Sequence, residues 1–114
     1  METTLLTIVA AWLAFKWLAG RNTHAGYVYV LEEPISKELK IGHTKGCVES
    51  RAKSIAKTLN VQRIDIIKII KTSDRFNLEK QLHNKYADYR LPSKQDGNGG
   101  SEWFSGQIKR DILS

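Results

Sequence analysis

The sequence predicts an α+β domain with a small three-stranded antiparallel sheet flanked by helices, preceded by an N-terminal apolar helix. Two strand-like runs, Tyr27–Leu31 and Leu39–His43, are close enough in sequence to pair as a hairpin. The segments after them alternate between helix-like and strand-like patterns, which indicates helices packed on a sheet. The apolar run at residues 4–19 predicts the separate first helix. A length of 114 residues leaves room for one small domain and little more.

The strands are predicted from their residue types. Tyr27–Leu31 is rich in β-branched and aromatic residues and is apolar on both faces, which is typical of a well-covered strand. Leu39–His43 follows a turn that contains Pro34 and forms the second strand of the hairpin. Ile64–Ile70 is the predicted third strand.

The helices of the domain are predicted from their apolar stripes. Val48–Leu59 carries its apolar residues on one helical face. Asp74–Tyr89 does the same, with Ser73 or Asp74 as its N-cap. A glycine-rich polar loop at residues 91–101 then leads through Glu102-Trp103-Phe104 into a short last helix that ends near Leu113.

Residues 1–20 have a different character from the rest of the chain. Residues 4–19 are apolar apart from two threonines and Lys16, and the apolar side chains go all round a helix, so lipid or protein must bury them. Sixteen helical residues reach about 24 Å, against a hydrocarbon core of about 30 Å. We predict a membrane anchor; a helix packed on the domain and a cleaved signal are the alternatives.

Positive charge lies at the far end of this apolar run, in Lys16 and Arg21. The positive-inside rule then predicts that the domain at residues 26–114, joined by a linker at residues 21–25, is in the cytoplasm. The expected protein is membrane-associated through residues 4–19, and without the anchor it would be cytoplasmic.

The charge balance suggests a polyanionic partner. The chain has 18 Lys and Arg against 12 Asp and Glu, a net charge of +6, and residues 1–20 are neutral, so the excess lies in residues 21–114. Nucleic acid is the commonest partner of a basic domain, anionic lipid is the rival, and solubility alone is the third explanation. The single cysteine, Cys47, excludes an internal disulfide and a cysteine-based metal site.

Two charged residues lie along the inward edges of their predicted helices. Arg51 follows Val48 by three residues, and Glu79 precedes Leu82 by three. A charge held against a sheet costs desolvation energy unless it has a partner. Arg51 and Glu79 therefore form either a buried salt bridge, which helix geometry alone slightly favours, or a site that binds a ligand.

Other candidate residues share faces with one another. Tyr27 and Tyr29 point to one face of their strand, and Lys40 and Gly42 share one face of the next, where Gly42 leaves room for a backbone or a phosphate. His83 follows Glu79 by four residues, a spacing that can bind metal but is more often a packing histidine. The remaining histidines, His24 and His43, carry no informative pattern.

These residues together resemble the GIY-YIG nuclease superfamily. Gly26-Tyr27-Val28-Tyr29 is similar to its first signature, and Lys40-Ile41-Gly42 to its second, with lysine in place of the tyrosine. Arg51 and Glu79 fall at the places of the family's arginine and metal-binding glutamate. The pieces Lys40-Ile41-Gly42-His43-Thr44, Leu78-Glu79-Lys80-Gln81-Leu82-His83 and Glu102-Trp103-Phe104 resemble the phage-orf or meiotically-up-regulated-gene branch.

The resemblance implies a GIY-YIG-like fold and metal-dependent hydrolysis of phosphodiester bonds in nucleic acid, with DNA expected over RNA. Glu79 would bind Mg²⁺ or Mn²⁺, and Arg51 would stabilise the extra negative charge of the transition state. Tyr29 would orient or deprotonate the attacking water, and Lys40 could still contact phosphate. We expect nucleic-acid contacts from Lys45, Lys53 and Lys57. Further site-lining candidates are Tyr27, Gly42, His43, His83 and Glu102, and the resemblance puts Glu102 or Asn98 near the place of the family's late asparagine.

Two other functions are compatible with parts of the sequence. A catalytically silent module of the same fold would bind nucleic acid through its basic face, but it has no need of Glu79 on an inward face. A membrane-associated adaptor would explain residues 4–19 but not the combination of Tyr29, Arg51 and Glu79.

Overall fold

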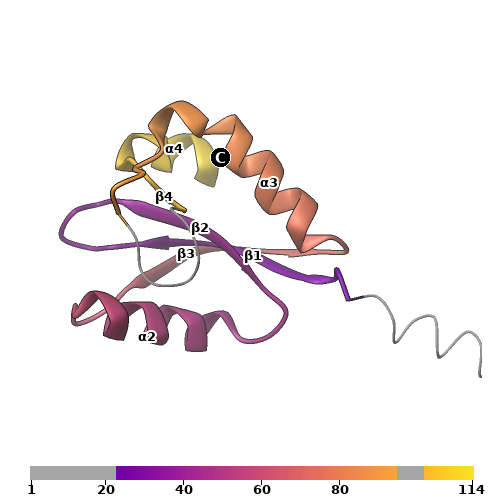
Figure 1. Cartoon of the computed structure of the whole chain (residues 1–114), viewed down its shortest axis with the longest axis horizontal. Coiled ribbons are helices and arrows are strands. Elements are labelled where there is room, and N and C mark those ends of the chain that lie inside the picture. The colour runs from indigo at the N-terminus through magenta and orange to yellow at the C-terminus, as the bar shows by residue number, and fades with distance from the viewer. Residues whose placement is uncertain (1–22, 95–101) are drawn as a thin grey trace, which may run out of the picture.

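The computed structural model describes residues 23–94 and 102–114 and has three layers: a four-stranded antiparallel sheet with helices on both faces (Figure 1). Helix α2 covers one face, and α3 with the C-terminal α4 covers the other. The elements, in chain order, are β1 (Gly26–Glu32), β2 (Leu39–Thr44), α2 (Val48–Leu59), β3 (Asp65–Thr72), α3 (Arg75–Lys85), η1 (Ala87–Tyr89), β4 (Trp103–Phe104), η2 (Gly106–Ile108) and α4 (Lys109–Leu113).

The strand order is β3-β1-β2-β4, so β1 is central and pairs on both sides. In the hairpin, Tyr29 lies opposite Gly42 and Leu31 opposite Lys40. A register irregularity between Val30 and Leu31 interrupts the pairing of β1 with β3. Because neighbouring residues in a strand point to opposite faces, β1 contributes alternately to two apolar layers, as expected for a strand that is apolar on both faces.

Each face of the sheet has its own hydrophobic core. Under α2 the core includes Tyr29, Leu31, Ile55 and Trp103. Under α3 and α4 it includes Val30, Ile41, Phe104 and Ile112. A sheet with a hydrophobic core and helices on each face is the α+β architecture predicted from the sequence. Helix α2 has the predicted bounds, Val48–Leu59.

The fourth strand corrects the prediction of three. Trp103 and Phe104, expected only to lead into the last helix, pair with Lys40 and Leu39 at the edge of β2. Both side chains are fully buried, one in each core. Two residues are too few to show a strand periodicity in the sequence. Strand β4 therefore could not be predicted, because it exists only through its long-range pairing with β2.

Helix α3 is shorter than the predicted Asp74–Tyr89. Asp74 is its N-cap, as expected, and its side chain accepts a hydrogen bond from the backbone N–H of Asn77. The helix ends at Lys85, and η1 follows as a separate turn. The chain leaves the helix there because Arg90 bridges to Phe104 of β4, which a continuous helix would prevent.

The predicted membrane anchor at residues 1–20 lies outside the described residues, so its prediction stands untested. Within residues 23–94 and 102–114, no helix is long and apolar enough to cross a membrane. Residues 23–25 of the predicted linker are bound to the start of α3. The backbone N–H of Arg75 donates to the carbonyl of His24 at 2.8 Å, and its guanidinium donates to the carbonyls of Thr23 and Ala25.

Candidate functional site

A cavity of about 160 Å³ collects side chains from both sides of the sheet. It is lined by residues of β1, β2, α2, α3 and the segment just before β4: Tyr29, His43, Arg51, Glu79 and Glu102. Strand β4 pairs with the first two residues of β2, and the backbone N–H of the third, Ile41, donates to the carbonyl of Glu102. Helices α2 and α3 cover opposite faces (Figure 1), yet side chains from both line this cavity. The structure thus brings Tyr29, Arg51 and Glu79 to one cavity.

Gly42 provides the space for the ring of Tyr29. A Cβ atom at Gly42 would lie 2.5 Å from the Tyr29 hydroxyl oxygen and 2.6 Å from the ring carbons, closer than any side chain tolerates. Tyr29 itself is only 3% exposed. The space at Gly42, which we expected to admit a backbone or a phosphate, is therefore occupied by the tyrosine opposite it.

Glu79 is a half-buried carboxylate whose Oε2 has no hydrogen-bond partner among the described residues. Its side chain is 15% exposed, and Oε2 lies 3.8 Å from Nε2 of His43. Desolvation by burial raises the pKa of Glu79 to about 7, the negative charge of Glu102 adds to the rise, and Lys40 opposes it. The group is therefore poised between its protonated and charged forms near neutral pH.

No ion pair joins Arg51 to Glu79, so the buried salt bridge slightly favoured by helix geometry is not formed. Arg51 is exposed on α2, while Glu79 projects from α3 on the opposite face of the sheet. Both charges instead line the same cavity, as the other interpretation required. Burial lowers the pKa of His43, and the positive charges of Arg75 and Arg51 lower it further.

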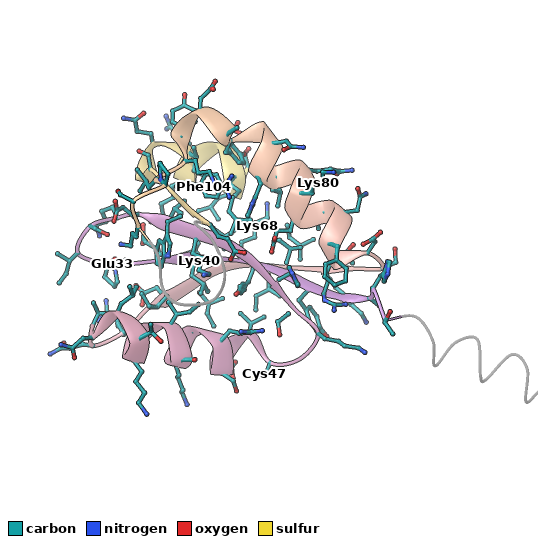
Figure 2. All side chains as sticks on the ribbon, viewed as in Figure 1. Glu33, Lys40, Cys47, Lys68, Lys80 and Phe104 are labelled. Carbon is teal, nitrogen blue, oxygen red and sulfur yellow. The ribbon has the colours of Figure 1, made fainter. Side chains whose placement is uncertain are left out.

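Lys40 is too deeply buried to contact a phosphate directly. It is 1% exposed on the α2 side of the sheet (Figure 2), and its Nζ is 3.4 Å from Oε2 of Glu102 and 5.9 Å from the centre of the Trp103 ring. It does not line the cavity. Its position points to a role exerted through Glu102, the residue just before β4. This contact was not expected, because β4 was not predicted.

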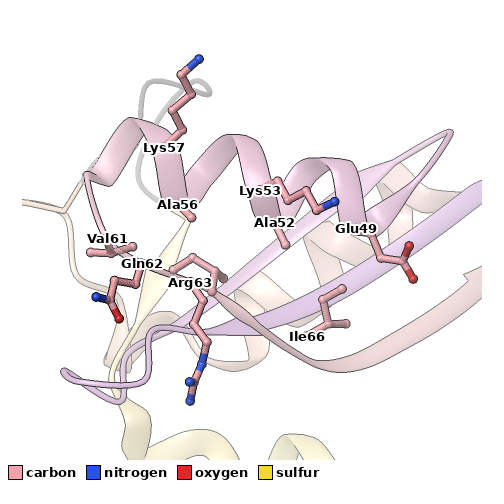
Figure 3. A pocket seen from close by; sticks show the side chains of 10 residues that line it. Glu49, Ala52, Lys53, Ala56, Lys57, Val61, Gln62, Arg63 and Ile66 are labelled. Atoms are coloured by element: carbon pink, nitrogen blue, oxygen red, sulfur yellow. The ribbon is translucent and has the colours of Figure 1, made fainter.

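The other predicted site residues lie away from this cavity. Tyr27 lines a separate cavity beside Cys47, and Nε2 of His83 is 2.9 Å from the carbonyl oxygen of Ile41. The exposed lysines are also outside it: Lys45 follows β2, and Lys53 and Lys57 border a groove between α2 and the start of β3 (Figure 3). Asn98 lies outside the described residues.

The residues of the cavity fit a divalent cation held mainly by one carboxylate. No group of three or more histidine, cysteine, aspartate or glutamate side chains in the described ranges could hold a metal. Mg²⁺ sites, however, are often built from one or two carboxylates, water and substrate phosphates. The buried, unpartnered Oε2 of Glu79 suits such a site, because an unsatisfied polar atom costs about 1–3 kcal/mol that a cation would recover.

Sequence reasoning missed the approach of His43 to Glu79. The period of β2 contains a partial signal, because Gly42 and Lys40 face α2, so His43 between Gly42 and Thr44 must face α3. Which part of α3 it meets depends on how far that helix reaches along the strand. The ring of Phe76 packs against His43 with centroids 4.8 Å apart and fixes this contact.

The chain matches a known protein family. The model of a family described as the T5orf172 domain matches residues 26–113. This is a phage-orf domain associated with nucleases of the GIY-YIG and HNH-like types. No curated protein and no solved structure matches the chain.

Proposed function

This chain belongs to the T5orf172 domain family, and we propose that it is a divalent-metal-dependent endonuclease that hydrolyses phosphodiester bonds in nucleic acid, with DNA as its substrate. The observation that carries the proposal is the single cavity shared by Tyr29, Arg51 and Glu79. These are three different chemical groups from three elements, and each has a use in phosphodiester hydrolysis. The buried, unpartnered oxygen of Glu79 supports a place for the ion.

Glu79 would hold Mg²⁺ or Mn²⁺ through its carboxylate. An ion bound there supplies a Lewis acid that stabilises negative charge on the phosphate oxygens. Arg51 is exposed and lines the same cavity, where its planar set of donors can bind the phosphate and stabilise the charge that develops in the transition state.

Tyr29 is the candidate for orienting and deprotonating the attacking water. A free tyrosine has a pKa of about 10 and is a poor base at neutral pH, so it needs positive charge nearby. Arg51 on the cavity wall can supply that charge. Gly42 leaves space for the ring, because a Cβ there would lie 2.5 Å from the Tyr29 hydroxyl oxygen. Lys40 would act as a positioning residue, holding Glu102 at 3.4 Å.

A plasmid-nicking assay with the full-length protein tests the proposal. Supercoiled DNA is incubated with Mg²⁺, with Mn²⁺, or with EDTA, using the wild type, Glu79→Gln and the control Glu49→Gln. Glu49 is an exposed glutamate on α2 that does not line the cavity. We expect metal-dependent nicking by the wild type and the control, and none by Glu79→Gln. DNA binding without nicking in either metal would refute the nuclease and favour the silent binding module.

A further inference from the structure

The histidine beside Glu79 has an environment that a structural histidine does not have. Nε2 of His43 is 3.8 Å from Oε2 of Glu79, too far for a hydrogen bond. Nδ1 of His43 and Oε2 of Glu79 are both buried without a hydrogen-bond partner in the described part of the chain. The ring is instead held by an edge contact with Phe76, at 4.8 Å between centroids.

His83 shows what a structural histidine looks like in this fold. Its Nε2 is 2.9 Å from the carbonyl oxygen of Ile41, and its ring packs against Phe104. That ring has a polar partner and links α3 to β2. His43 has the packing contact but no such hydrogen bond: its Nδ1 is buried without a partner in the described part of the chain, and its Nε2 lies 3.8 Å from Oε2 of Glu79. An imidazole in this situation is suited to a ligand that arrives from outside the protein.

We propose that His43 is a second metal-binding residue beside Glu79, and that its imidazole makes the centre prefer Mn²⁺ to Mg²⁺. This inference rests on the proposed function, because it concerns the same ion. Two ligand atoms, each about 2.1 Å from one ion, are separated by about 3.0 Å at a right angle and by about 4.2 Å in line. The observed 3.8 Å between Nε2 and Oε2 lies inside that interval, so one ion could contact both atoms after a small shift of the two side chains.

The metal preference follows from the ligand types. Mg²⁺ is a hard ion that prefers oxygen ligands, whereas imidazole nitrogen suits first-row transition ions better. A mixed pair of one nitrogen and one carboxylate therefore favours Mn²⁺ relative to a site built from oxygen alone.

Metal binding to the full-length protein, measured without nucleic acid, tests the inference. Bound Mn²⁺ is determined from the electron paramagnetic resonance signal of the free ion, and Mg²⁺ is then added as a competitor. The variants are His43→Phe, which keeps a ring against Phe76, and His43→Glu, which replaces nitrogen by oxygen. His24→Phe is the control, since His24 is exposed and does not line the cavity.

We expect His43→Phe to weaken Mn²⁺ binding by about tenfold or more, and His24→Phe to leave it unchanged. His43→Glu should keep metal binding but raise the affinity for Mg²⁺ relative to Mn²⁺. Mn²⁺ affinity in His43→Phe within about twofold of wild type, or the same Mn²⁺-to-Mg²⁺ ratio in His43→Glu as in wild type, would overturn the inference.

Glu79→Gln separates this inference from the proposed function. If Glu79→Gln abolishes Mn²⁺ binding while His43→Phe does not, only the role of His43 is refuted. If the wild type binds no Mn²⁺, the inference about His43 fails, and the nicking assay decides the proposed function separately. If Glu79→Gln binds Mn²⁺ as well as the wild type, both proposals fail. Thermal melting of each variant shows whether it is folded, and the His43→Glu ratio gives a result even if His43→Phe unfolds.

Discussion

Glu79 combines burial with the lack of a hydrogen-bond partner, and this combination has a cost for stability. Its pKa rises from 4.5 to about 7 on folding, mainly through desolvation. The folded protein therefore binds more protons than the unfolded chain between these two pH values. It follows that the wild type loses stability as the pH rises from about 4.5 to about 7, and that the whole loss is present above about pH 7.

Glu79→Gln should therefore stabilise the domain at pH 8, because glutamine has no charge to bury. A pKa difference of this size corresponds to at most about 3 kcal/mol. Urea unfolding at pH 4, 6 and 8 measures the effect, and the gain should disappear near pH 4, where both side chains are neutral. A gain that is the same at all three values would contradict this account of Glu79, and Glu49→Gln should show no such trend.

The contact between Gly42 and Tyr29 gives a second test at the scale of one residue. In Gly42→Ala the new methyl group would meet the buried tyrosine ring at 2.5–2.6 Å. We expect a destabilisation of about 1–3 kcal/mol and a loss of DNA cleavage as the ring is displaced. Gly46→Ala is a matched control, because a Cβ there meets nothing within 4 Å. Equal unfolding free energies and nicking rates for the two variants would show that the ring can move freely.

The sequence predicted well those elements whose ends depend on nearby residues, such as an apolar stripe or a helix cap. Helix α2 has the predicted bounds, since its apolar stripe ends at Leu59 and Asn60 adopts the left-handed cap with φ 57°. Strands β1 and β2 extend the predicted runs by one residue at one or both ends. Strand β4 was missed because its two residues become a strand only by pairing with β2, and α3 was predicted too long because the bridge of Arg90 to Phe104 lies far away in sequence.

In the candidate site, too, the sequence identified residues by their local pattern but not the contacts that depend on long-range packing. Tyr29, Arg51 and Glu79 could be selected by their faces and by resemblance, and they line one cavity, although their chemical roles stay predictions. The depth of Lys40 could not be predicted, because β4 and Glu102 cover it. The approach of His43 to Glu79 could not be predicted either. It depends on where α3 packs along β2, and the sequence of neither element alone determines that position.

The link between α3 and the edge of β2 is a property of the two elements, and His83 is its polar contact. His83→Leu would keep an apolar side chain against Phe104 but leave the carbonyl of Ile41 without this partner. We expect a loss of about 1–3 kcal/mol in the free energy of unfolding. Because Glu79 lies one turn earlier on α3, Mn²⁺ affinity should fall as well. Gln81→Leu, on the exposed side of α3, should change neither, and parallel denaturation and Mn²⁺ titrations measure both effects.

Over the whole molecule, the net charge of +6 predicts salt-dependent binding of nucleic acid. Lys53 and Lys57 are exposed on α2 (Figure 3) and do not line the cavity that contains Glu79, so they should contribute to affinity without taking part in the chemistry. Lys53→Gln and Lys57→Gln should each reduce the slope of log affinity against log salt by about 1, measured by fluorescence anisotropy. Lys80→Gln on α3 is the control. Unchanged slopes in both α2 variants would place the DNA on another surface.

The N-terminal apolar run gives the prediction that concerns the chain as a whole. We propose that residues 4–19 hold the protein at the membrane with the domain in the cytoplasm, since the apolar side chains go all round the helix and the positive charges, Lys16 and Arg21, lie at its far end. The family match begins only at residue 26, and the run contributes nothing to the positive charge of the domain. Deleting residues 1–20 should therefore move the protein from the membrane fraction to the soluble fraction.

DNA nicking and the melting temperature of the domain should survive this deletion, because the described cores and the cavity are built from residues after Gly26. Residues 23–25 are retained, and with them the hydrogen bonds to Arg75 at the start of α3. Cell fractionation, nicking and melting of both forms measure the outcome. If the run instead packs on the domain, its removal exposes an apolar patch and causes aggregation. A soluble full-length protein beside an aggregating truncated one would make residues 4–19 part of the core rather than an anchor.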